Sequence, residues 1–253
     1  MFVDDTQIYL QCKPDSLDEA IKTISEDATS FANYVTKIGL KINLKKTKAM
    51  IFGSNYYVSQ IDLSICSQIL INGQPISYVT STKSLGVWLD QELSWNEQIA
   101  KIVAKVNSSL FCLKMHKHSL SFNVHKHLVE TLIFPQFDYA CVPLLNCSDE
   151  LNIKLERALN SAIRFVFRIP RFFHISYYRN QLCWLKMKYR RQYFLGTALH
   201  SIFRTGYPTF LALRFIPLED IEGLRLIQRN RQDDPSNFKS ALYNHLLALQ
   251  ISS

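Results

Sequence analysis

The chain has 253 residues, of which 47% are hydrophobic and 20% charged, with only 7 glycines and 8 prolines. This composition excludes a disordered or fibrous protein and predicts a globular chain with a substantial core. Its apolar stretches are far shorter than the roughly 18 residues of a membrane helix, so we expect no membrane span. We expect an intracellular protein, nuclear or cytoplasmic, because the chain does not begin like a secretion signal.

Positive charge is concentrated in one segment. The whole chain carries a net charge of +8, but the segment from Lys154 to Arg191 holds ten basic residues against the single acidic residue Glu156. The remaining residues are close to neutral. A segment of this kind predicts an anionic partner, and a phosphate backbone is the most obvious one.

The beginning of the chain is predicted to mix strands with one long helix. Segment 2–11 alternates around Asp4 and Asp5, which predicts two short strands that turn at the carboxylates. A helix is predicted over 16–38, because apolar residues recur there at steps of three or four and Gly39 supplies a stop.

The next segments predict further strands. We expect one strand at 48–52, a hairpin over 68–79 that turns at Asn72-Gly73, and another strand at 84–89. This first part of the chain is therefore predicted to be α+β.

From about residue 95 the apolar spacing becomes helical and remains so. Helices are predicted over 122–133, 149–168, 181–203 and 236–249, separated by prolines. We expect three regions, 1–94, 95–215 and 216–253.

Two interpretations apply to the acidic pair. Adjacent carboxylates in a turn are most often solvated turn formers. Here apolar and aromatic residues flank Asp4 and Asp5, so at least one carboxylate is predicted to face the sheet, where it needs a partner. A divalent cation such as Mg²⁺ supplies that partner in two-metal phosphoryl transfer.

Three motifs follow one another within the first 95 residues. They are FVDDTQ at 2–7, GLKINLKKTK at 39–48 and SLGVWLDQELSW at 84–95. In this order they resemble the aromatic-x-Asp-Asp hairpin, the GL-x-x-N-x-x-K-T stretch and the LGV-x-LD-x-x-LSW segment of reverse transcriptases from non-LTR retrotransposons of the jockey type. The resemblance continues more loosely to about residue 195.

The resemblance implies a partial palm at 1–94, followed by a helical thumb-like region and a connection. It implies RNA-directed DNA synthesis with Mg²⁺ held by Asp4 and Asp5, on an RNA template and DNA primer or an RNA–DNA hybrid. It places Lys46 near the triphosphate, although a solvated lysine is an equally good interpretation. It also assigns a primer-grip role to Leu85, Gly86 and Val87, where ordinary sheet is the alternative.

In this family the fingers and a further metal-binding aspartate precede the Asp-Asp hairpin, whereas only Met1 precedes Phe2 here. We therefore expect a fragment of a mobile-element polymerase that is inactive without its missing N-terminal portion. The alternative is a non-catalytic helical protein, derived from such an element, that binds nucleic acid or another partner.

The predicted helix 149–168 has two unlike faces at about 100° per residue. Leu155, Leu159, Ala162 and Val166 share one side, while Arg157, Arg164 and Arg168 lie opposite. A solvated charged face is the commoner interpretation, but guanidinium groups repel one another unless an anion lies between them. The aromatic residues Trp184, Tyr189 and Tyr193 lie among basic residues and are candidates for stacking on bases. The predicted nucleic-acid-binding residues are Arg157, Arg164, Arg168, Arg171, Lys186, Lys188, Arg190 and Arg191.

Overall fold

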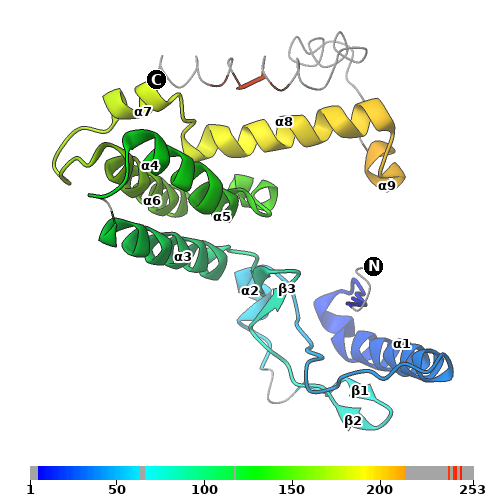
Figure 1. Cartoon of the computed structure of the whole chain (residues 1–253). Helices are drawn as coiled ribbons and strands as arrows, with labels where there is room; N and C mark the ends of the chain where they lie inside the picture. Colours follow the sequence, from blue (N-terminus) through cyan, green and yellow to red (C-terminus); the bar gives the residue numbers. More distant parts are fainter. Residues whose placement is uncertain are drawn as a thin grey trace. The chain divides into compact units, whose positions relative to one another are not determined.

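The computed structural model describes residues 5–62, 66–116 and 118–214, together with Lys239, Leu242, Tyr243 and Leu246. It is α+β, as predicted, with mainly helical structure and two small antiparallel sheets among the described residues (Figure 1). The chain divides into two compact units, Met1–Gln98 and Ile99–Ser253, which are described separately below. None of the helices in the described ranges is long and apolar enough to cross a bilayer.

Unit 1 begins with one long helix. Helix α1 spans Leu17–Lys37 and follows a 3₁₀ turn at Pro14–Ser16, which confirms the helix predicted over 16–38. Ser16 precedes the helix, and its hydroxyl donates to the carbonyl of Lys13 and makes no capping bond to the helix. Gly39 follows the helix with a φ of 83°, a backbone conformation that suits a residue without a β-carbon.

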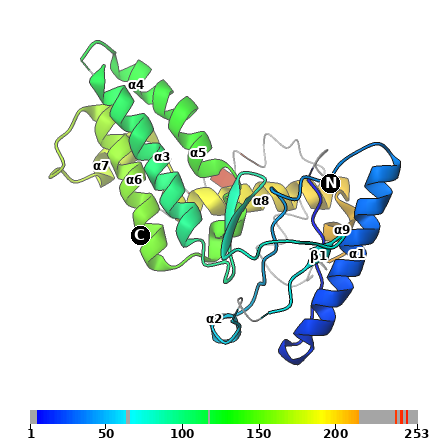
Figure 2. The ribbon, with the colours of Figure 1, turned by 90° about the horizontal axis from the view of Figure 1, so that it is seen from below.

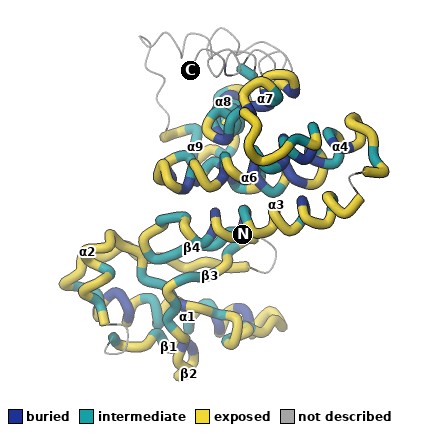
Figure 3. The backbone as a smooth tube through the Cα atoms, turned by 90° about the vertical axis from the view of Figure 1, so that its left-hand side faces the viewer, coloured by how far each residue is buried: buried dark blue, intermediate teal, exposed yellow. Residues whose placement is uncertain are grey.

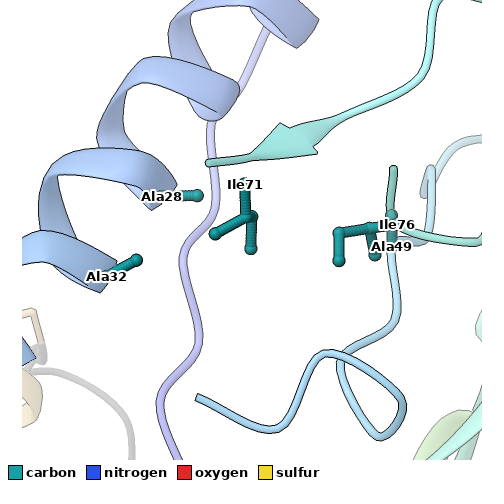
Figure 4. Close-up of a cluster of buried hydrophobic side chains, with 5 residues drawn as sticks. All are labelled: Ala28, Ala32, Ala49, Ile71 and Ile76. Carbon is teal, nitrogen blue, oxygen red and sulfur yellow. The ribbon is translucent and has the colours of Figure 1, made fainter. Parts of the chain in front are cut away.

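A small apolar cluster holds α1 against the following strands (Figure 4). Ala28 and Ala32 point from the helix toward Ile71, and Ile76 and Ala49 lie on the other side of that isoleucine. All five residues are buried. Because alanine has a short side chain, the helix backbone approaches the chain segment that carries Ile71 closely.

Two hairpins complete the β structure of unit 1. Strands β1 (Leu70–Ile71) and β2 (Gln74–Pro75) pair around Asn72-Gly73, which confirms the turn predicted there. Strands β3 (Ser81–Ser84) and β4 (Val87–Asp90) form the second hairpin. The single strand predicted at 84–89 is therefore wrong, because the chain reverses at Leu85-Gly86.

Other strand predictions fail. In segment 48–52 only Ala49 pairs, through one parallel bridge to Tyr78, and the short helix α2 (Asn55–Val58) follows. Asp5 lies in an isolated bridge, but residues 6–13 form no strand, so the second strand predicted after the carboxylates is absent. Residues 1–4, which include the first predicted strand, lie outside the described residues.

All the regular secondary structure among the described residues of unit 2 is helical. Helix α3 begins at the end of unit 1. The helices are α3 (Asn96–Met115), α4 (Phe122–Leu128), a π-helical turn (Val129–Ile133), α5 (Phe134–Asp138), a 3₁₀ turn (Val142–Asn146), α6 (Asp149–Phe167), α7 (Ser176–Leu182), α8 (Met187–Thr205) and α9 (Thr209–Ala212). The helix predicted over 236–249 lies outside the described residues, apart from the four named above.

Two helix boundaries in unit 2 differ from the prediction. The helix expected to end before Pro135 continues to Asp138, because the π-helical turn at 129–133 places the proline in the first turn of α5, where its missing N–H costs little. The helix expected over 181–203 is divided between α7 and α8, because Cys183 has a left-handed φ of 55° and ends α7.

The core of unit 2 is centred on α6, where buried positions recur along the helix (Figure 3). Leu155, Leu159, Ala162 and Val166, predicted to share the packing face, are all at most 3% exposed. Buried side chains also come from α3, the π-helical turn and α5: Ile99, Ile102, Val106, Leu110, Val129, Ile133, Phe134 and Phe137.

Candidate nucleic-acid interface

A pocket of about 820 Å³ lies over the C-terminal half of α6 in unit 2. Five of its lining residues are cationic, and none of the described lining residues is acidic. The cationic residues are Lys114, Arg157, Arg164, Arg168 and Arg171; the others are His118, Asn160, Ser161, Phe165, Ile169 and Pro170. The pocket is therefore a concentrated positive site with neutral hydrogen-bonding groups between the charges.

The local fold of α6 explains why these arginines lie together. The Ser148 hydroxyl accepts a hydrogen bond from the Leu151 amide at 3.4 Å and begins the helix, and Asp149 and Glu150 occupy its first turn. Arg157 and Arg164 are seven residues apart, two helical turns along one side. Arg164 lies in the last turn of α6 and Arg168 ends the helix, where the helix dipole favours positive charge.

The charged form of Arg164 is disfavoured in this pocket when no anion is bound. Burial lowers the pKa of its guanidinium, and the charge of Arg171 lowers it further. Its Nε is buried and has no hydrogen-bond partner among the described protein atoms. A bound anion would oppose both effects, because it favours the charged guanidinium and accepts its hydrogen bond.

Arg168 has a structural role beside its place in the pocket. It ends α6 in the left-handed conformation, with a φ of 56°, and its guanidinium donates to the carbonyl of Leu120. This bond joins the end of α6 to the segment that precedes α4. Arg157, Arg168 and Arg171 are all exposed and line the pocket, but Arg168 in addition makes this bond to Leu120.

Two other predicted nucleic-acid-binding residues are engaged inside unit 2. Arg190 pairs with Asp138 and lies over the Phe134 ring, 4.1 Å from its centroid. Arg191 is 3% exposed and donates to the side-chain oxygen of Asn152. These two cations hold helices of unit 2 together. They do not form the nucleic-acid-binding surface that the sequence predicted for them.

Lys186 and Lys188 are not among the residues that line the pocket. Lys186 is partly buried at the start of α8, and Lys188 is exposed.

Two of the predicted base-stacking residues lie against other side chains of unit 2. Trp184 is 3% exposed and donates to Glu130 at 3.1 Å, and Tyr193 packs edge-on against Tyr243.

Residues that sequence reasoning missed complete the site. Lys114 and His118 come from the end of α3 and the segment after it, more than thirty residues before the arginines they join. No local pattern links them to α6, so only the packing of the helices brings them there. Phe172 and Phe173, which are 94% and 53% exposed, follow Arg171 directly.

The residues predicted to be catalytic lie in unit 1. Asp4 lies outside the described residues, Asp5 is exposed, and Lys46 is exposed in the turn that follows Asn43. Asn43 forms that turn, since its carbonyl accepts the amides of Lys46 and Thr47, both at 3.0 Å. None of the described contacts joins Lys46 to Asp5.

The first and third motifs meet in unit 1. The side-chain amide of Gln7 donates to the Ser84 hydroxyl at 2.6 Å, next to the turn at Leu85-Gly86. Leu85 is 44% exposed at that turn, and Val87 opens β4. The segment after the predicted carboxylates therefore lies beside the predicted primer grip.

The third motif also has a structural explanation. Both carboxylate oxygens of Asp90 accept hydrogen bonds from Ser94, one from its amide at 2.8 Å and one from its hydroxyl at 2.9 Å. The side-chain oxygen of the buried Gln98 accepts the Trp88 amide at 3.0 Å. The Asp90 bonds fix the segment between β4 and α3, and the Trp88 bond connects β4 to the first turn of α3.

Asp5 is the one predicted Mg²⁺ ligand within the described residues, because Asp4 lies outside them. The described residues contain no group of three or more histidine, cysteine, aspartate or glutamate side chains placed to hold a metal ion. No chemical step through the metal follows from this arrangement.

Comparison with protein-family models, with curated proteins and with solved structures gave no match to this chain.

Proposed function

We propose that this chain is part of a reverse transcriptase of a non-LTR retrotransposon, and that unit 2 binds the sugar-phosphate backbone of its template and primer. The observation that carries the binding role is the basic pocket on α6, where five cationic side chains meet without an acidic one among the described lining residues. Phosphate contacts of this kind supply most sequence-independent affinity for nucleic acid.

The polymerase assignment rests on the three motifs and on one contact between them. A polymerase of this type needs its carboxylates and its primer grip close together, because both act at the primer end. The hydrogen bond from Gln7 to Ser84 supports that arrangement, since it joins the segment after Asp5 to the Leu85-Gly86 turn.

A second candidate is a non-catalytic nucleic-acid-binding protein derived from such an element. It is favoured by the position of the pocket. All of the lining residues belong to unit 2, so the pocket contains none of the predicted catalytic residues, which lie in unit 1. The coding sequence upstream of Met1 separates the two candidates. An in-frame fingers region with a further palm aspartate is expected for the polymerase, and the lack of such a region favours the second candidate.

Fluorescence anisotropy with a labelled RNA–DNA hybrid across a salt series tests the binding role. We expect log affinity to fall linearly with log salt concentration. The combined substitutions Arg157→Gln, Arg164→Gln and Arg171→Gln should weaken binding and reduce the slope by roughly 0.9 for each lost phosphate contact, the value for B-form DNA. Arg168 is left unchanged because of its bond to Leu120.

The matched control removes the same number of charges from exposed positions of unit 2 that do not line the pocket. It combines Lys105→Gln, Arg204→Gln and Arg214→Gln. This variant should keep a slope closer to that of the parent. Equal losses in the two triple variants would show that net charge, and not the pocket, determines binding.

A further inference from the structure

The connection between α6 and α7 carries two exposed aromatic rings. Residues 168–175 extend away from the helices of unit 2 as a loop, seen from two directions in Figures 1 and 2. Phe172 is 94% exposed and Phe173 is 53% exposed. Scattered exposed apolar residues are common, but two adjacent exposed phenylalanines within one loop form a concentrated apolar surface.

The loop is held at both ends. The Ile169 amide donates to the Arg164 carbonyl at 3.1 Å, and Ile175 is buried at the start of α7. Between these ends the Phe173 amide donates to the Pro170 carbonyl at 3.3 Å, which closes a turn around the two rings. The rings are thus presented on a fixed base.

The loop segment that carries the rings begins at the edge of the basic pocket. Pro170 and Arg171 both line the pocket, and Phe172 and Phe173 are the next two residues. Two residues span at most about 7 Å, so a short strand whose phosphates contact Arg171 is within reach of both rings. A positively charged groove beside exposed aromatic residues is the arrangement that binds single-stranded nucleic acid.

We propose that Phe172 and Phe173 stack on unpaired bases of a nucleic acid whose backbone lies in the basic pocket. This inference rests on the proposed function and adds a preference for single-stranded segments. Bases in a duplex have both faces covered by their neighbours, whereas unpaired bases offer a face to an aromatic ring. The positive charge of the pocket favours a nucleic acid over an apolar protein surface as the occupant.

The full-length chain is tested with three labelled probes: a short oligothymidylate, the same backbone with abasic sites, and a blunt RNA–DNA hybrid. The parent should bind the oligothymidylate more tightly than the abasic strand, because the backbone charge is equal and only the bases differ. Combined Phe172→Leu and Phe173→Leu substitutions should weaken oligothymidylate binding by about fivefold or more and leave the other two probes unchanged. Tyrosine at both positions (Phe172→Tyr with Phe173→Tyr) should keep the parent's affinity for the oligothymidylate.

Several outcomes overturn the proposal. If the leucine variant loses affinity equally for all three probes, the rings support the loop and do not stack on bases. If the parent binds the hybrid, the abasic strand and the oligothymidylate with equal affinity, stacking is excluded while the proposed function stands. If the parent binds none of the probes, both proposals fail together.

Discussion

Arg190 and Asp138 form a two-point ion pair between α8 and the end of α5. Arginine Nε donates to Oδ1 and Nη2 donates to Oδ2, each at 2.5 Å. Both side chains are largely buried, at 15% and 21% exposure. The pair therefore fixes the relative position of two helices that lie about fifty residues apart in the sequence.

Replacing Asp138 with asparagine should destabilise unit 2 by about 2 kcal/mol, because a buried guanidinium would lose its counter-charge while one hydrogen bond persists. Urea unfolding followed by circular dichroism measures this loss. The control is Lys126→Gln, which breaks an exposed ion pair to Glu130 at 3.9 Å and should cost less than about 0.5 kcal/mol. Equal effects would mean that the buried pair adds little to stability.

The two hairpins of unit 1 turn with the same backbone but different residues. Asn72-Gly73 has φ values of 51° and 76°, and Leu85-Gly86 has 47° and 84°. Asparagine tolerates this left-handed conformation better than leucine. Leu85→Asn should therefore raise the free energy of unfolding of the full chain by about 1 kcal/mol, measured in urea.

The reciprocal substitution Asn72→Leu serves as the matched test. It should lower the free energy of unfolding by a similar amount, because it places leucine in the other left-handed turn. If Leu85→Asn destabilises the chain instead, packing of the partly exposed Leu85 side chain outweighs the strain of its backbone.

Cys141 makes stability depend on pH at the alkaline end. Burial raises the pKa of its thiol from 9.0 to about 11, and the nearby charge of Asp138 adds to this increase. Above pH 9 the unfolded chain loses this proton while the folded chain keeps it, so stability falls as pH rises. The contribution is fully present below pH 9 and is lost by about pH 11, a change of up to about 3 kcal/mol.

Urea unfolding of the parent and of Cys141→Ala, both with a reducing agent, checks this expectation. Other groups titrate in the same interval, so the difference between the two proteins is the quantity of interest. That difference should stay constant from pH 7 to about 9 and then decrease toward pH 11. A constant difference over the whole interval would mean that Cys141 titrates as an exposed thiol does.

The pocket should also reduce stability when nothing is bound. Burial is the main cause of the lowered pKa of Arg164, and repulsion by the charge of Arg171 lowers it further. Arg171→Gln should therefore stabilise the free protein by about 0.3 to 0.5 kcal/mol at low salt, and the gain should disappear at high salt. Thermal melts at two ionic strengths measure it. Arg204→Gln, in the last turn of α8, should give no such gain, because the helix dipole favours a cation there.

Periodicity predicted the long helices well, since α1 and α6 agree with it almost residue for residue. Both helices are amphipathic, and the burial of one apolar face stabilises them, so the apolar spacing in the sequence is enough to predict them. The Leu85-Gly86 turn was missed because leucine is an unusual residue at a positive φ and carries no turn signal. The break after Leu182 was missed for the same reason, since Cys183 takes a left-handed conformation usually given to glycine.

The candidate site could be predicted only in part. The row of Arg157 and Arg164 follows from helical spacing alone. Arg190 and Arg191 belong to the same basic segment of the sequence as those two arginines. Their partners Asp138 and Asn152, however, lie 52 and 39 residues away in the sequence. A charge count cannot separate a cation that binds a ligand from one that pairs within the core, because that depends on tertiary contacts.

The π-helical turn at Val129–Ile133 has a consequence for the length of this part of the chain. A π turn holds one residue more than an α-helical turn. Deleting that extra residue would leave a regular α-helix in which the residues on either side of the turn keep their faces. Deleting a residue from the regular helix α4 would instead rotate everything after it by about 100°, which would turn Phe134 and Phe137 out of the core and Asp138 away from Arg190. A one-residue deletion is therefore expected to be tolerated inside the π-helical turn and not in the helix before it.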